Sequence, residues 1–88
     1  MTFLARVFVT LKPTVNDPQG LTVKSGLKSL GFQTVDSVRI GKYMELRLDA
    51  PTADAASEQV RQMCQKLLAN PVIEQYRFEL EKAPDQVA

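Results

Sequence analysis

Apolar and polar residues alternate along three stretches of the chain, and this period of two predicts β-strands. The first stretch covers residues 3–12 and the last covers residues 75–80. The middle stretch, residues 35–49, is interrupted by Gly41, which predicts two strands joined by a turn. The pattern therefore predicts four strands.

The pairing of the two middle strands depends on the length of their turn. A two-residue Gly-Lys turn would set apolar side chains opposite charged ones. A three-residue connection, or one bulged residue, instead pairs Ile40 with Met44 and Val38 with Leu46, so that all four side chains share one face. We prefer the second arrangement because a one-residue slip would turn the apolar set to the wrong face.

Two stretches with helical spacing lie between the predicted strands. Asp17 can cap the first helix, Pro18 suits its first position, and Gly31 after Leu30 predicts a left-handed C-terminal cap. Thr52 or Asp54 can cap the second helix, which ends before Asn70-Pro71. The predicted buried stripe of this second helix is Val60, Met63, Cys64, Leu67 and Leu68.

The order strand, helix, strand, strand, helix, strand predicts an α+β, ferredoxin-like βαββαβ fold. We expect a four-stranded antiparallel sheet with two helices on one face, and with the first and third strands central. Residues 1–82 form the single expected domain, and residues 83–88 form a short polar tail.

The uncovered face of this sheet predicts self-association. Leu4 and Phe8 lie on the second face of the first strand, where a solvated sheet would carry polar residues. We therefore expect a homo-oligomer that uses Leu4 and Phe8, through sheet faces or sheet edges.

The composition removes several classes of function. The 88 residues include no histidine and one cysteine, Cys64, so histidine-dependent nucleophilic catalysis is excluded. Gly26 and Gly31 have part of the spacing of a phosphate-binding loop, but its lysine is missing. We expect no catalytic residues, no cofactor and no metal site.

The charge and the cysteine content bear on partners and localisation. A net charge of +1 without a basic patch argues against nucleic acid and membrane as partners. The lone cysteine and the lack of a leader segment predict a cytoplasmic protein.

The tip of the predicted hairpin carries the most suggestive surface side chains. Arg39, Lys42 and Tyr43 cluster there, and arginine and tyrosine are enriched at interface hot spots. These three residues are our candidates for contacts with partner proteins.

Four segments together resemble one family. They are Asp17-Pro18-Gln19-Gly20, Leu30-Gly31-Phe32, residues 38–46 and residues 66–74. They resemble PurS, the small subunit of multi-subunit phosphoribosylformylglycinamidine synthase of purine biosynthesis.

The resemblance implies a non-catalytic assembly subunit. Its expected partners are the large ATP-dependent amidating subunit and the glutaminase subunit, which it would bridge to support ammonia transfer, and it would form a homodimer or a dimer of dimers. The alternative is a small-molecule-sensing regulatory module, because ferredoxin-like dimers often bind ligands between subunits.

Overall fold

The structure, a computed structural model, describes residues 1–83, and it has the α+β composition that the sequence predicts. Its elements in chain order are β1 (Thr2–Leu11), α1 (Pro18–Ser29), β2 (Gly41–Asp49), α2 (Ala53–Met63), a π-helical turn (Cys64–Leu68) and β3 (Glu74–Lys82). Within these residues the sheet has three antiparallel strands in the order β2-β1-β3.

The core lies on one face of β1, the central strand. Its side chains alternate as predicted, and Ala5, Val7 and Val9 are fully buried. The register places Ala5 between Leu46 of β2 and Leu80 of β3, so the apolar faces of the three strands coincide.

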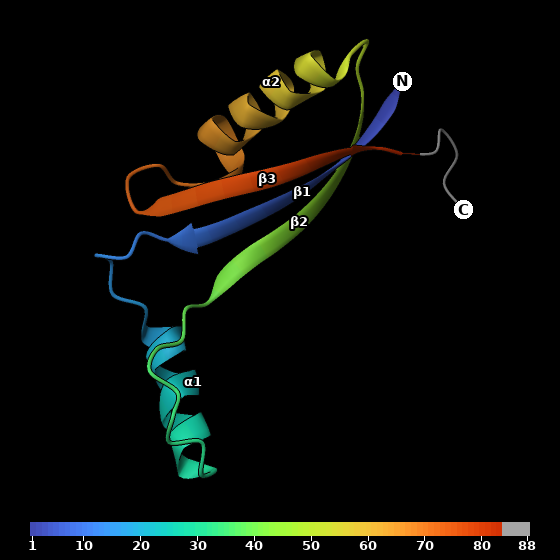
Figure 1. Cartoon of the computed structure of the whole chain (residues 1–88). Coiled ribbons are helices and arrows are strands. Elements are labelled where there is room, and N and C mark those ends of the chain that lie inside the picture. The colour runs from blue at the N-terminus through green and yellow to red at the C-terminus, as the bar shows by residue number, and fades with distance from the viewer. Residues whose placement is uncertain (84–88) are drawn as a thin grey trace.

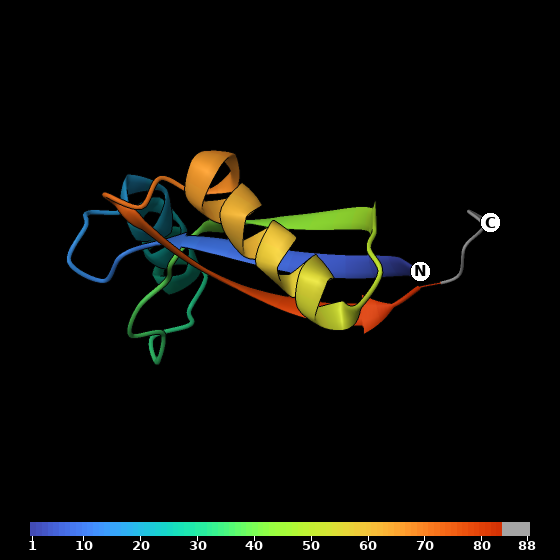
Figure 2. The same ribbon diagram turned by 90° about the horizontal axis from the view of Figure 1, so that it is seen from above.

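Helix α2 covers this apolar face and crosses the strands diagonally (Figure 2). The hydroxyl of Thr52 accepts a hydrogen bond from the Ala55 amide, which confirms Thr52 as the N-terminal cap. Ala56, Val60 and Cys64 are fully buried against the sheet. The second helix therefore packs where its apolar stripe predicts.

The end of this helix departs from the prediction at Leu67, which is 82% exposed. The helix closes with a π turn, in which the Ala69 amide donates to the carbonyl oxygen of Cys64 at 2.9 Å. A π turn contains one residue more than an α-turn, and this extra residue rotates Leu67 out of the buried stripe. Leu67 was wrongly predicted to be buried.

Helix α1 has the predicted caps. The Asp17 carboxylate accepts from the Gly20 amide, and Pro18 stands in the first turn. At the other end Gly31 has φ 100°, and the Phe32 amide donates to the Leu27 carbonyl at 3.0 Å. This bond closes a Schellman-type cap, which requires a left-handed residue at the position of Gly31.

The position of α1 contradicts the prediction that both helices cover one face. Figure 1 shows α1 projecting beyond the end of the sheet where β1 ends and β2 begins, while α2 alone lies over the strands. The radius of gyration is 16.8 Å, whereas a compact chain of this length has about 12 Å. We call residues 12–40, which comprise α1 and its two connecting segments, the arm.

The prediction of a four-stranded sheet is also wrong for the residues that the structure describes. Residues 35–40 have no regular secondary structure and do not pair with β2, and β2 instead begins at Gly41, opposite Thr10. As a result β2 is an edge strand, where the sequence predicted a central one. The physical reason is that residues 35–40 run back along α1, which Gly20 permits: a Cβ there would lie 2.2 Å from the Val38 carbonyl oxygen.

Candidate functional site

A polar junction fixes the base of the arm to the sheet. At its centre is Asp17, which is 4% exposed. One oxygen of its carboxylate accepts from the Gly20 amide at 2.9 Å, and the other accepts from the Ile40 amide at 2.8 Å. The same carboxylate therefore caps α1 and holds the segment that leads into β2.

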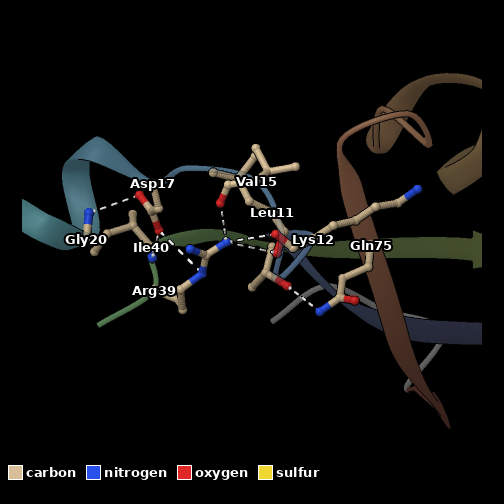
Figure 3. A network of polar contacts seen from close by, with 9 residues as sticks. Leu11, Lys12, Val15, Asp17, Gly20, Arg39, Ile40 and Gln75 are labelled. Atoms are coloured by element: carbon tan, nitrogen blue, oxygen red, sulfur yellow. Dashed lines mark hydrogen bonds and ion pairs between the residues drawn. The ribbon is translucent and has the colours of Figure 1, made fainter. Parts of the chain in front are cut away.

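Arg39 completes the junction from the opposite side (Figure 3). Its guanidinium donates to the carbonyl oxygens of Lys12 at 2.9 Å and Val15 at 3.0 Å, and its Nε lies 3.9 Å from Asp17 Oδ2. Arg39 thus joins the outgoing and returning segments of the arm. The sequence predicted Asp17 only as a helix cap, because nothing in the local pattern indicates its bond to Ile40.

The junction holds the pKa of Asp17 below its ordinary value. The largest cause is the hydrogen bond from the Ile40 amide, followed by the bond from Gly20, and the charge of Arg39 acts in the same direction. Because the folded pKa is lower than the unfolded one, the resulting stabilisation is complete above the ordinary pKa of about 4. It is lost as the pH falls through the folded value.

We therefore expect acid to weaken the junction. The Tm of the wild type should fall more between pH 6 and pH 3 than the Tm of Asp17→Asn, which cannot titrate at this position, as measured by circular dichroism. All other carboxyl groups are the same in both proteins. Equal losses of Tm in the two proteins would show that Asp17 does not contribute to acid sensitivity.

Lys42 and Tyr43 begin β2 and point to opposite faces of the sheet. Lys42 Nζ lies 3.8 Å from Glu74 Oε2, and the Tyr43 hydroxyl donates to Glu45 at 2.8 Å. This hydrogen bond is the main cause that raises the pKa of Tyr43. All three residues are exposed, but the guanidinium of Arg39 is directed toward the carbonyl oxygens of the junction. The structure therefore brings the predicted cluster into one region of the chain but not onto one surface.

The open face of the sheet, opposite α2, carries the predicted self-association residues. Phe8 lies between Tyr43, with ring centroids 5.1 Å apart, and Arg77, whose guanidinium carbon is 3.9 Å from the Phe8 ring centroid. Leu4 is half-buried, and in register it lies between Arg47 and Glu81. The open face is consequently a charged surface around one aromatic cluster, and its use in self-association stays a prediction.

An apolar groove lies on the other side of the sheet, between the free edge of β2 and α2. It has a volume of about 540 Å³ and is lined by Leu46, Gln59, Gln62, Met63, Lys66, Leu67 and Leu68. The sequence pattern did not predict this groove. It depends on the outward rotation of Leu67 and on the absence of α1 from this face.

In residues 1–83 no group of three or more candidate metal ligands comes together, and neither helix could cross a membrane. The Cys64 thiol is buried, and burial raises its pKa, so the reactive thiolate is disfavoured. Within residues 1–83 the fold is a small α+β domain with the element order β-α-β-α-β, and its prominent surface features are the open sheet face, the free edge of β2 and the apolar groove.

Comparison with known families agrees with this class. The family model PurS, described as phosphoribosylformylglycinamidine (FGAM) synthase, matches residues 4–82. The chain belongs to the PurS family and is a PurS subunit of FGAM synthase, an enzyme of purine biosynthesis.

Individual relatives cover most of the chain. A PurS subunit from Synechocystis is 56% identical over 75 residues, which are 85% of this chain and 75% of the relative. The PurS subunit from Bacillus subtilis is 46% identical over 84 residues, which are 96% and 99% of the two chains. A chain in the structure of PurLQS from Thermotoga maritima is 31% identical, covers 92% of this chain and 99% of its own length, and has a TM-score of 0.85.

Proposed function

We propose that this chain is a non-catalytic assembly subunit of FGAM synthase. In this role the domain of residues 1–82 bridges the large ATP-dependent amidating subunit and the glutaminase subunit, so that ammonia passes from one to the other. The observation that carries the proposal is the likeness to a chain of the Thermotoga maritima PurLQS structure over nearly the full length of both chains.

The composition supports a bridging role over a chemical one. The sequence has no histidine, and its cysteine is buried. Ammonia that equilibrates with bulk water near neutral pH becomes mostly ammonium, which lacks the nucleophilic lone pair. A subunit that holds the large and glutaminase subunits together shortens the distance that ammonia must travel between them, so less of it is protonated on the way.

We also propose that the chain acts as a homodimer or a dimer of dimers. Leu4 and Phe8 on the open face remain candidates for one of the contacts between copies. The mixture of charges around them favours an interface with polar pairing across it.

Assembly itself tests the proposal. The large and glutaminase subunits from the same organism are mixed with and without this chain, and the mixtures are separated by size-exclusion chromatography. We expect the three proteins to co-elute only when this chain is present. Co-elution of the two larger subunits without it, or elution of this chain alone, would contradict the bridging role.

Lys42 and Tyr43 are the proposed contacts with the larger subunits. We expect the double variant Lys42→Ala/Tyr43→Ala to weaken assembly about tenfold or more, because truncation of hot-spot side chains typically costs 2 kcal/mol or more. Gln65→Ala, at an exposed residue of the π-helical turn after α2, is the matched control and should assemble like the wild type. Equal affinities of the two variants, measured by biolayer interferometry, would remove this surface from the interface.

A further inference from the structure

We propose that the cavity where the arm meets the sheet binds a free α-amino acid with an aliphatic side chain. The residues that carry this inference all belong to one chain. The site goes beyond the bridging role, so binding of the amino acid and assembly with the larger subunits succeed or fail independently.

The cavity has the size and the lining of a small-molecule site. It has a volume of about 540 Å³ and lies between the base of the arm and the adjacent end of the sheet. Sites for small molecules typically have volumes of about 300–1,000 Å³. Val9 and Leu11 of β1 and Pro18 and Ile40 of the arm supply its apolar lining. An aliphatic side chain that enters the cavity leaves water for apolar surroundings, which favours binding.

Two opposite charges border this cavity side by side. Lys42 belongs to β2 and Glu74 to β3, the two strands that flank β1. Lys42 Nζ lies 3.8 Å from Glu74 Oε2, which is too far for a hydrogen bond. The pair therefore leaves both an ammonium group and a carboxylate oxygen with capacity for further partners.

The Glu74 carboxylate has one engaged oxygen and one available oxygen. Oε1 accepts a hydrogen bond from the Asn70 amide at 2.7 Å. Within residues 1–83 no hydrogen-bond donor reaches Oε2, although the Glu74 side chain is only 16% exposed. A carboxylate oxygen with little access to water and no donor is unfavourable, and a ligand that brings an N–H group relieves this.

A free α-amino acid carries the matching pair of charges. Its ammonium and carboxylate groups are attached to one carbon atom, so they lie side by side, as do the charges of Glu74 and Lys42. In the proposed complex the ammonium donates to Glu74 Oε2, and the carboxylate accepts from Lys42 and from the side-chain amide of Gln19. Gln19 also borders the cavity, and its side chain makes no hydrogen bond within the described residues.

Ligands with other charges fit this cavity less well. A basic ligand would be repelled by Lys42, and an acidic ligand would be repelled by Glu74. Asp17 also borders the cavity, but its carboxylate already accepts from the amides of Gly20 and Ile40. The chemistry of the cavity therefore favours a ligand with both charges and no net charge.

NMR titration of the full chain tests the site. L-Leucine should shift the backbone amide signals of Gln19, Gly41 and Glu74 in a saturable way, with a Kd of about 1 mM or lower. N-Acetyl-L-leucine lacks the ammonium group and L-leucinamide lacks the carboxylate, and each should bind about tenfold more weakly or worse. No saturable shift with millimolar L-leucine, or equal affinities for the three compounds, would overturn the proposal.

Two variants of β3 locate the ligand. Glu74→Gln keeps an oxygen for the Asn70 amide but removes the charge that the ammonium group requires, so it should weaken L-leucine binding about tenfold or more. Glu79→Gln is the matched control, because Glu79 is an exposed carboxylate of the same strand that pairs with Arg77, and it should bind like the wild type. Circular dichroism confirms that both variants are folded. Equal affinities of the two variants would contradict the placement of the ligand at Glu74.

The outcomes separate this site from the bridging role. Saturable binding of L-leucine by a chain that fails to co-elute with the larger subunits would support the site and overturn the bridging role. Co-elution by a chain that does not bind L-leucine would overturn the site and support the bridging role.

Discussion

Replacement of Asp17 by alanine is expected to release the base of the arm and to lower the Tm by roughly 5–10 °C. The change removes the cap of α1 and leaves the amides of Gly20 and Ile40 without their acceptor. It also leaves the guanidinium of Arg39 without its carboxylate partner. Because one side chain makes all three contacts, the loss should exceed that of an ordinary helix cap.

Hydrogen exchange locates this effect. In Asp17→Ala the amides of Gly20 and Ile40 should exchange much faster than in the wild type, while amides of β1 should change less. Asp36→Ala is the matched control, because Asp36 is an exposed aspartate of the same arm. Unchanged exchange at Ile40 in Asp17→Ala would contradict the role assigned to the junction.

Replacement of Val60 by alanine should destabilise the fold by about 2–3 kcal/mol. Val60 is fully buried in the layer between α2 and the sheet, and it is one of the largest side chains with no exposed surface. Its truncation leaves a cavity that the neighbouring strands cannot fill by local movement. In a domain of this size the Tm should fall by roughly 10–20 °C.

Urea unfolding measures this loss directly. Gln65→Ala, an exposed substitution close to the same helix, should stay within about 0.5 kcal/mol of the wild type. If both variants lost the same stability, α2 would not be packed on the sheet through Val60.

The sequence predicted the features that depend on neighbouring residues. The alternation in β1 identified its buried face, and the caps at Asp17, Gly31 and Thr52 are confirmed. Each of these follows from the preference of a residue type for a local geometry. The family resemblance, which rests on several such segments, is confirmed by the match over residues 4–82.

The prediction failed where long-range contacts override local preference. The alternation of Val38 and Ile40 is typical of a strand, yet the Asp17 carboxylate and α1 hold this segment away from β2. Leu67 has the right spacing for burial, but the π turn moves it outward. For the same reason the apolar groove and the junction could not be predicted, since each joins residues far apart in sequence.

We propose that this chain couples glutamine hydrolysis to amidation without performing either reaction. The most direct measurement is glutamine-dependent synthesis of formylglycinamidine ribonucleotide by the large and glutaminase subunits with and without this chain, with ammonia as nitrogen donor in a parallel assay. The bridging role predicts that adding the chain restores glutamine-dependent turnover and changes ammonia-dependent turnover little. Glutamine-dependent turnover that is the same with and without the chain would contradict it.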